Sequence, residues 1–431
     1  MLAAMPPEPD AAAPGAAVPD RARPDACPGA LRLHPADDGA LARIRLPGGL
    51  LTNRQALALA DAARELGDGR LEVTSRGNVQ LRGLASDCGG ELGGRLRAVG
   101  LLPSDTHERV RNIVASPGPA AGLADVRAWA RALDLALCAS PWATGLSGKF
   151  LFVLDDGGGD VAALDADVTL IAGPDGTALL RLGRAATVRP VRADHAVCAA
   201  LDAAREFLEA QRAAGVRAWH LREVPELLPP GPLPMPVLAG TRPPLGALPG
   251  GGLHVGLRFG LAGADQWRAL VDAAEGELRL TPWRGAVLPG APAGRLAALA
   301  EAGFRTAATA WDGASACTGL PGCAKSLADV RADAARALDG APAAAGASGA
   351  SAAAGAEGLA GVPMAAGGLP VHWSGCERRC GHPAGRRVDV LATGQGYRVA
   401  VEGPHPGRVT AVEVTNEEMA AAVAAARRTT T

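Results

Sequence analysis

The sequence lacks an excess of either charge and lacks long apolar runs. It has 43 lysines and arginines against 44 aspartates and glutamates over 431 residues. A dedicated nucleic-acid binder carries a basic excess that neutralises phosphate, so this balance argues against that class, and an anionic ligand must be held by local arginines. Residues 1–26 contain no apolar signal-peptide core, and no run reaches the roughly 18 apolar residues of a membrane span. We therefore expect a cytoplasmic protein with no nucleic-acid or membrane partner.

A dinucleotide-binding fingerprint is also missing. No G-x-G-x-x-G follows an expected strand, and this motif shapes the phosphate-binding turn of a dinucleotide fold. Electrons from NADH would therefore reach the protein through a partner reductase or a small ferredoxin.

Four of the eight cysteines form two close pairs. Cys317 and Cys323 stand in a C-x5-C pattern, and Cys376 and Cys380 stand in a C-x3-C pattern. A 4Fe-4S cluster needs four thiolates that converge on one small volume, and two short loops can supply them. Structural zinc and two disulfides are the alternatives. We favour the cluster, in a compartment that keeps thiols reduced. The other cysteines are expected to have no role: Cys27, Cys88, Cys138 and Cys198.

The first ordered region predicts a ferredoxin-like half-domain over residues 31–103. Alternating apolar residues at 41–46 indicate a strand, and Thr52 with Gln55 forms a capping box at the start of a helix. A hairpin that turns at Arg76 follows, which gives the strand–helix–strand–strand order of a split βαβ unit.

This unit recurs later in the chain. Residues 69–83 align without gaps to residues 276–290, and "ALADAA" before the first copy resembles "ALVDAA" before the second. The spacing of about 200 residues is far above solenoid repeat lengths, so we expect a duplicated half-domain at 251–308.

The remaining boundaries follow from composition and pattern. They are a disordered lead-in at 1–30, an α+β domain at 104–221, a proline-rich linker at 222–250, a cysteine-bearing domain at 309–415 with a low-complexity insert at 339–370, and a polar C-terminal helix and tail at 416–431. Within the α+β domain, alternation at 149–155, 167–173 and 177–183 predicts an antiparallel sheet. Asp194 is expected to cap a helix with Val197 and Leu201 on its buried face.

With the cysteine pairs and the duplication in place, the chain resembles the nitrite and sulfite reductase superfamily. The resemblance covers about residues 30–415. It is carried by TSRGNVQLRG (74–83), RNIVASP (111–117), SGKF (147–150) and HWSGCERRCGHP (372–383). It implies an α+β fold of duplicated ferredoxin-like half-domains with 4Fe-4S domains, and cluster ligands at Cys317, Cys323, Cys376 and Cys380.

The resemblance also implies a set of polar binding residues. Arg76 and Gln80 match the family's T-x-R-x-x-x-Q, Arg111 matches R-N-[IV], and Lys149 matches the first lysine of K-F-K. In the reductases these cations bind sirohaem carboxylates and the anionic substrate, and guanidinium grips carboxylate in a bidentate fork. We expect Arg76, Gln80, Arg82, Arg111 and Lys149 to bind substrate and Arg111 and Lys149 to be catalytic; solvated surface charges are the alternative.

Two departures from the reductases indicate a different reaction. Leu151 stands where they carry the second lysine of K-F-K, and Glu377-Arg378-Arg379 replaces their P-N-x. Six-electron reduction needs protons and positive charge at the haem face, and a leucine supplies neither. The resemblance then implies an oxidoreductase of cobalamin biosynthesis, a monooxygenase that hydroxylates precorrin-3A with O2 and closes a ring acetate to a lactone. The alternatives are a sirohaem-dependent sulfite or nitrite reductase and a non-enzymatic electron carrier or tetrapyrrole-binding protein.

The oxygen-activating centre stays open at this level. A separate non-haem iron is one candidate cofactor, and His382, beside the last paired cysteine, is a conceivable ligand. One histidine without a second histidine and a carboxylate in pattern is not a facial triad. We favour a histidine that is hydrogen-bonded near the cluster.

Overall fold

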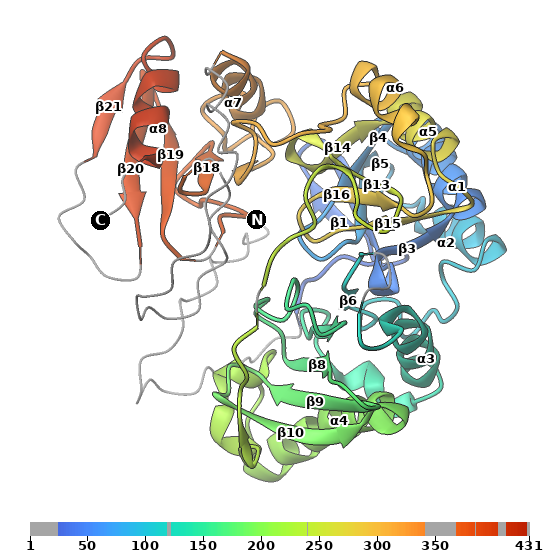
Figure 1. Ribbon diagram of the computed structural model, residues 1–431. Helices are drawn as coiled ribbons and strands as arrows, with labels where there is room; N and C mark the ends of the chain where they lie inside the picture. The colour runs from blue at the N-terminus through green and yellow to red at the C-terminus, as the bar shows by residue number, and fades with distance from the viewer. Residues whose placement is uncertain are drawn as a thin grey trace. The chain divides into compact units, whose positions relative to one another are not determined.

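The computed structural model describes residues 25–118, 122–238, 240–340, 368–383, 385–403 and 411–428. Among these, residues 25–35 and 39–306 form one compact unit, the large unit, and residues 36–38 and 307–428 form another, the C-terminal unit. Figure 1 shows the helices and strands of both units. Residues 1–24 of the lead-in expected at 1–30, and residues 341–367 of the insert expected at 339–370, lie outside the described residues.

The first half-domain begins the large unit. Its elements are β1 (His34–Ala36), β2 (Gly39–Ile44), β3 (Leu50–Thr52), α1 (Asn53–Leu66), β4 (Arg70–Val73), β5 (Val79–Leu84) and α2 (Gly89–Ala98). The predicted capping box is confirmed, because the Thr52 hydroxyl accepts the Gln55 backbone N–H and the Gln55 side chain accepts the Thr52 N–H. The predicted hairpin of β4 and β5 is confirmed as an antiparallel pair.

The second half-domain repeats this order. Its elements are β12 (Gly246–Ala247), β13 (Leu253–Gly256), β14 (Leu261–Gly263), α5 (Ala264–Asp272), β15 (Glu277–Leu280), β16 (Gly285–Leu288) and α6 (Leu296–Glu301). The strand orders are β1-β2-β5-β4-β14 and β12-β13-β16-β15-β3, so each half lends its third strand to the other's sheet. A short 3-10 turn with a left-handed residue, Gly48 or Phe259, precedes each lent strand. The predicted duplication is therefore confirmed.

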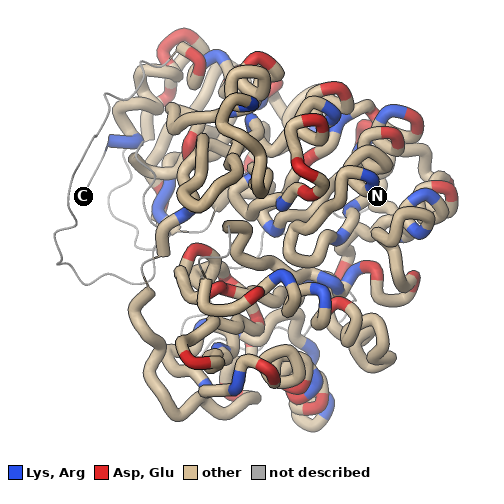
Figure 2. Tube along the Cα trace, turned by 45° about the vertical axis from the view of Figure 1, so that its right-hand side comes forward, with Lys and Arg blue, Asp and Glu red and all other residues tan. Residues whose placement is uncertain are grey.

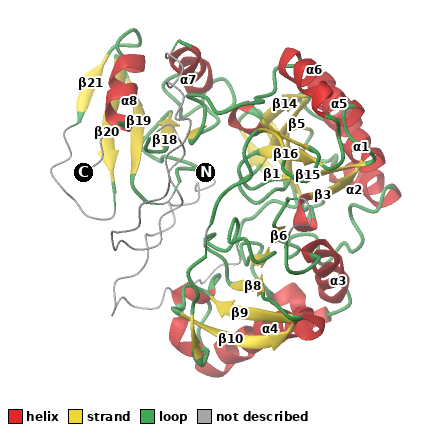
Figure 3. Cartoon of the chain, viewed as in Figure 1, coloured by secondary structure: helices red, strands yellow, loops and turns green. Residues whose placement is uncertain are grey.

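One apolar core serves both halves. Helices α1, α2, α5 and α6 gather on one side of the two sheets (Figure 3), and α1 lies against α5. Leu59 and Leu81 of the first half share the core with Trp267 and Leu288 of the second, and the Trp267 indole N–H donates to the Ala56 carbonyl at 3.0 Å. Each half therefore completes the folding of the other.

The α+β domain lies between the two halves in sequence. Its elements are β6 (Ile113–Ala115), α3 (Val126–Cys138), β7 (Phe152–Asp155), β8 (Val168–Ala172), β9 (Thr177–Leu182), β10 (Thr187–Arg192), α4 (Ala196–Ala214) and β11 (Leu233–Pro234). The sheet order is β11-β10-β9-β8-β7-β6, and α3 and α4 contact it and each other. β11 and β12 both arise inside the expected linker at 222–250 and pair with β10 and β13.

Two predictions for this domain are wrong. The sheet is not wholly antiparallel, because β6, β7 and β8 run parallel. β7 and β8 are buried at every position, as parallel strands covered on both faces are. Asp194 does not cap α4: it pairs with Arg192, and the helix starts at Ala196 and buries Ala200, Ala203 and Phe207.

Residues 25–30 of the expected disordered lead-in are ordered. Asp25 accepts hydrogen bonds from the Ser147 hydroxyl and the Gly148 N–H, both at 2.8 Å, and Cys27 is buried. Composition did not reveal this order, because the partners lie about 120 residues away in sequence.

The C-terminal unit is a second mixed sheet with two helices. Its elements are β17 (Ala314–Ala316), α7 (Val330–Asp339), β18 (Val371–Ser374), β19 (Arg387–Thr393), β20 (Gly396–Glu402), β21 (Val412–Val414) and α8 (Met419–Arg427). β17, β18 and β19 are parallel, and β20 and β21 add antiparallel. The polar character predicted for the last helix is wrong, since Met419 and Val423 are buried. No helix among the described residues has the length and apolar character that a membrane crossing requires.

Candidate functional site

The first half-domain carries basic side chains on the sheet face opposite its core. Side chains alternate along a strand, so Ile44 and Leu46 enter the core while Arg43 and Arg45 lie on the other face. Arg43 stands opposite Gln80 of β5 and donates to its side-chain carbonyl at 2.9 Å. We call Arg43, Arg45, Arg76, Gln80 and Lys149 the basic face.

The structure brings the predicted residues Arg76 and Lys149 together. The Arg76 guanidinium, in the β4–β5 turn, donates to the Lys149 backbone carbonyl at 3.0 Å. The Arg45 guanidinium contacts the Gly148 carbonyl at 3.4 Å. The hairpin, the end of β2 and the segment before β7 therefore converge at one place.

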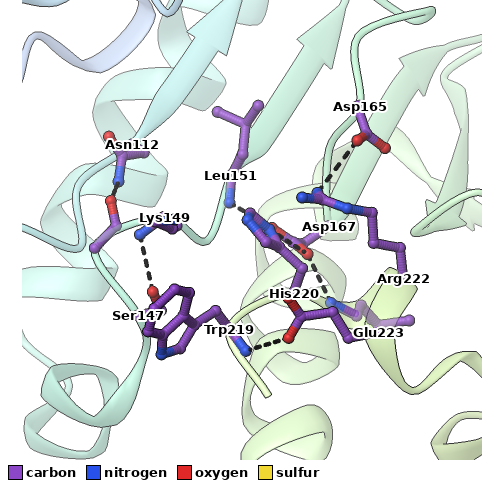
Figure 4. Close-up of polar contacts among 12 residues, drawn as sticks. Asn112, Ser147, Lys149, Leu151, Asp165, Asp167, Trp219, His220, Arg222 and Glu223 are labelled. Atoms are coloured by element: carbon purple, nitrogen blue, oxygen red, sulfur yellow. Dashed lines mark hydrogen bonds and ion pairs between the residues drawn. The ribbon is translucent and has the colours of Figure 1, made fainter. Parts of the chain in front are cut away.

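Polar groups fix the segment at 147–149. The Asn112 amide donates to the Gly148 carbonyl at 2.7 Å, and the Lys149 N–H donates to the Ser147 hydroxyl at 3.1 Å (Figure 4). Lys149 is 5% exposed, and its Nζ lies 4.5 Å from the ring centre of Trp219, a cation–π contact. The ammonium is thus held in place by its surroundings.

Two arginines of the basic face keep buried guanidinium nitrogens without hydrogen-bond partners among the described residues. Arg45 is 2% exposed, and burial, reinforced by the charges of Arg43 and Arg76, lowers its pKa to about 9. Among the described residues, Nε and Nη1 of Arg45 and Nε of Arg43 have no hydrogen-bond partner. A buried unpaired charge is costly. Lys and Arg are otherwise interspersed with Asp and Glu along the chain (Figure 2), so this local cluster is suited to a carboxylate ligand.

The Arg111 guanidinium is paired elsewhere and is not part of the basic face. Its Nε and Nη2 donate to the Asp134 carboxylate at 2.6 and 2.7 Å, and its Nη1 donates to the Leu101 carbonyl at 3.0 Å. The ion pair lines a cavity of about 230 Å³ together with Arg45 and Glu277. Three of the five N–H groups of Arg111 are thus already used within the protein, which does not favour its predicted substrate-binding and catalytic role.

Arg82 lies two residues beyond Gln80 on β5 and so shares its face of the sheet. Burial lowers the pKa of His34, and the charges of Arg43 and Arg82 lower it further. Arg43 and Arg82 therefore both lie near His34, and the substrate-binding role of Arg82 stays a prediction.

Leu151 belongs to an apolar cluster. It is 4% exposed and packs with Val114, Val153 and Trp283. Its backbone N–H donates to Asp167 at 2.8 Å, and Asp167 also contacts His220 Nδ1 at 3.1 Å (Figure 4). A lysine here would bury its charge among apolar groups.

The four paired cysteines meet in the C-terminal unit. Burial raises the pKa of the Cys380 thiol, and the charges of Cys317, Cys376 and Cys323 raise it further, which places all four thiols close together. Cys317 Sγ accepts the Gly375 N–H at 3.2 Å. A Cβ at Gly375 would lie 1.8 Å from the Ser326 hydroxyl oxygen, so only glycine fits there.

This thiol set fits an iron–sulfur cluster better than the alternatives. All eight cysteines are free thiols, so no disulfide is formed among these described residues. No three of the four described sulfurs lie within 4.8 Å of one another, whereas tetrahedral zinc with bonds of about 2.3 Å needs sulfurs roughly 3.8 Å apart. A cluster binds each cysteine through a different iron atom and accepts the wider spacing. Because burial also raises the pKa of Cys317, metal binding must displace protons.

Among the described residues, His382 belongs to no group of three or more side chains close enough to share a metal ion. Its Nδ1 lies 3.2 Å from the Pro383 carbonyl. Within the described ranges, three aspartates, Asp155, Asp156 and Asp160, form the one group close enough to share an ion. The Asp155 carboxylate already accepts four backbone N–H groups of its own loop, so we assign no ion there.

Sequence reasoning missed Arg43, Arg45 and Asp25. The alternation in "LARIRL" predicts a strand, and the same alternation places both arginines on one face beside Gln80. That signal was available. Asp25 gave no local signal, because its role depends on distant partners.

The chain is similar in sequence to several known proteins. Residues 34–88 match the nitrite/sulfite reductase ferredoxin-like half domain. A precorrin-3B synthase from Sinorhizobium sp is 27% identical over 411 residues, which is 89% of this chain and 83% of that protein. A ferredoxin–nitrite reductase from Synechococcus elongatus is 37% identical over 126 residues, 27% of this chain and 25% of that protein. A sulfite reductase [NADPH] hemoprotein beta-component from Acidithiobacillus ferrooxidans is 38% identical over 97 residues, 21% of this chain and 17% of that protein.

A solved structure shows the same fold. The Mycobacterium tuberculosis NirA protein superposes with a TM-score of 0.64 at 18% identity, over 89% of this chain and 79% of that one. The protein therefore has an α+β fold of this type, carries the nitrite/sulfite reductase ferredoxin-like half domain, and resembles precorrin-3B synthase along most of its length.

Proposed function

We propose that the protein converts precorrin-3A to precorrin-3B with O2, by hydroxylating the macrocycle and closing a ring acetate to a lactone in cobalamin biosynthesis. The near full-length similarity to a precorrin-3B synthase supports this reaction. The observation that carries the proposal is the basic face, where half-buried Arg43 and buried Arg45 hold guanidinium N–H groups without hydrogen-bond partners among the described residues.

A precorrin is a tetrapyrrole rimmed with carboxylates, which can accept hydrogen bonds from the unbonded guanidinium nitrogens of Arg43 and Arg45. Arg45 and Arg43 would each donate charged hydrogen bonds, worth about 1.5–3 kcal/mol apiece. Arg76 is tied to the Lys149 carbonyl and Lys149 is held over Trp219, so both cations are positioned before substrate arrives. Prior positioning reduces the entropy lost on binding.

Cys317, Cys323, Cys376 and Cys380 would hold a 4Fe-4S cluster. When bound, such a cluster supplies electrons one at a time. Monooxygenation consumes two electrons and two protons, placing one oxygen atom in the macrocycle and the other in water. A ferredoxin or a reductase would deliver the electrons in the cytoplasm, and a non-haem iron is the candidate for activating oxygen.

The alternative is a sirohaem-dependent sulfite or nitrite reductase, as two of the relatives are named. The buried apolar setting of Leu151 disfavours it, because reduction of these anions needs cationic proton donors at the haem face.

The test uses protein purified without oxygen. We expect four iron and four sulfide per chain, broad cluster absorbance without sirohaem bands, and O2-dependent formation of precorrin-3B from precorrin-3A with reduced ferredoxin. Sulfite or nitrite turnover together with a sirohaem spectrum would overturn the proposal and establish the alternative.

A further inference from the structure

A row of polar side chains crosses the sheet of the C-terminal unit beneath the second cysteine loop. Ser315 of β17, His372 of β18 and Asp389 of β19 stand in register with one another. Their exposed fractions are 8%, 0% and 1%. Buried polar groups need hydrogen bonds. His372 and Asp389 form hydrogen bonds with the loop between Cys376 and Cys380.

His372 holds the backbone of Cys380. Its Nε2 lies 3.1 Å from the Cys380 carbonyl oxygen, and its Nδ1 lies 2.9 Å from the Ser315 hydroxyl. A carbonyl only accepts, so Nε2 carries the proton, and Nδ1 accepts from the hydroxyl. That hydroxyl is farther, 3.3 Å, from its other acceptor, the Val371 carbonyl.

Asp389 holds the preceding residue. Its carboxylate accepts from Arg379 Nε at 2.8 Å. Arg379 has a φ of 46°, in the left-handed region that a non-glycine residue adopts at a cost. Arg379 Nη1 also donates to Glu377 at 2.6 Å, inside the same loop. The side chain of Arg379 therefore anchors an unfavourable backbone turn immediately before Cys380.

The tethers matter because burial does not fix Cys380. It is exposed, whereas Cys317, Cys323 and Cys376 are half-buried. The contact of the Arg379 side chain with Asp389 and the contact of the Cys380 carbonyl with His372 supply the restraint.

We propose that His372 and Asp389 are positioning residues, which fix the turn at Arg379 and so place the Cys380 sulfur where a cluster can bind it. This inference rests on the proposed function, in which these cysteines hold a 4Fe-4S cluster. It assigns a role to residues that the cysteine pattern alone does not indicate.

The test compares His372→Leu with His372→Gln in full-length protein purified without oxygen. Leucine removes the donor to Cys380, whereas the glutamine amide keeps one at similar reach. We expect His372→Leu to bind less than half the iron and sulfide of wild type, to bleach at least about tenfold faster in air, and to change the electron paramagnetic resonance of the reduced cluster. His372→Gln should restore most of each value.

A second set of variants keeps the test decisive if His372→Leu does not fold. Asp389→Asn keeps the shape but removes the charge, and Arg379→Gly suits the left-handed turn but removes the tether. Both should bleach faster and show a changed resonance with an unaltered far-ultraviolet circular dichroism spectrum. A wild-type-like cluster in Arg379→Gly and Asp389→Asn, or in folded His372→Leu, would overturn the inference alone. Absence of iron and sulfide from wild type would overturn the proposed function as well.

Discussion

Arg45 lies buried beside Arg43 and Arg76, and two of its nitrogens have no partner among the described residues. Replacing a buried unpaired charge by an apolar side chain of similar length removes its desolvation cost. We expect Arg45→Met to raise the free energy of unfolding of the ligand-free protein by about 1–3 kcal/mol. The same change should weaken precorrin-3A binding roughly 10–150-fold, the loss of about 1.5–3 kcal/mol.

Urea unfolding and substrate titration measure the two effects separately. Arg97→Met is the matched control, because Arg97 forms an exposed pair with Asp105, and should alter either quantity by less than about 1 kcal/mol. An Arg45→Met protein that loses stability and keeps its affinity would show that Arg45 is a structural residue.

For Arg111 we expect the opposite pattern, a loss of stability with little change in precorrin-3A affinity. Arg111 is paired in a bidentate manner with Asp134, and its side chain is 4% exposed. Arg111→Ala leaves the carboxylate without its partner and should cost about 3–5 kcal/mol of stability, because breaking a buried pair is strongly destabilising. Adding Asp134→Ala should recover part of this loss in a double-mutant cycle, with precorrin-3A affinity close to wild type. A large loss of affinity with little loss of stability would restore the substrate-binding role first predicted for Arg111.

Asp160 should make the free energy of unfolding depend on pH. Burial raises its pKa to about 7, opposed by a hydrogen bond from Ser116 and assisted by the charges of Asp155 and Asp156. The native protein then keeps a proton that the unfolded chain has lost, so the Asp160 contribution to stability falls as pH rises toward 7. Asp160→Asn removes this dependence. Its stability advantage over wild type should grow by about 2 kcal/mol between pH 5.5 and pH 8, at about 1.4 kcal/mol per pH unit below the folded pKa. Urea midpoints at both pH values test this, and an advantage that stays constant with pH would contradict it.

At the scale of elements, the exchanged strands β3 and β14 make the two half-domains mutually dependent. β14 pairs with β4, and β3 pairs with β15. A fragment of residues 31–103 lacks the partner of β4 and exposes core residues that Trp267 covers. Unpaired strand edges favour aggregation. We expect this fragment alone to be insoluble or unfolded by circular dichroism, and to become soluble when co-expressed with residues 245–308. Cooperative unfolding of the isolated fragment would contradict this dependence.

Elements with local signals were predicted from sequence, and those set by distant partners were not. The Thr52 capping box and the hairpin at Arg76 depend on residues a few positions apart, and both are confirmed. The exchange of β3 and β14 depends on pairing across about 200 residues, which composition and periodicity do not encode. The parallel direction of β7 was missed for the same reason, because burial on both faces hides the direction of a strand.

The candidate site residues also include some that were predicted from sequence and some whose contacts were not. The cysteine spacing identified four thiols that do meet, and the resemblance identified Arg76 and Lys149, which are in contact. The partner of Arg111 could not be foreseen, because Asp134 stands 23 positions away on a helix with no motif of its own. Whether an arginine pairs with a carboxylate of the protein or stays available for a ligand depends on the tertiary structure.

At the scale of the whole molecule, the cysteines separate into one functional group and a remainder. Changing any one of Cys317, Cys323, Cys376 or Cys380 to Ser should remove the cluster absorbance and abolish turnover, because a cluster needs all four thiolates. Cys88→Ser and Cys198→Ser, in the large unit, are the controls and should match wild type in iron, sulfide and activity. Full iron and sulfide in Cys323→Ser would contradict the assignment.

The strand exchange also has a consequence for synthesis of the protein on the ribosome. β4 ends at Val73, and its partner β14 begins at Leu261. At about 5–20 residues per second, the roughly 190 residues between them take about 10–40 seconds to translate. During that interval the nascent first half-domain has an open strand edge and half a core. Because the second copy lies so much later in the chain, we expect that a chaperone or the translating ribosome itself shields this intermediate until the second copy emerges.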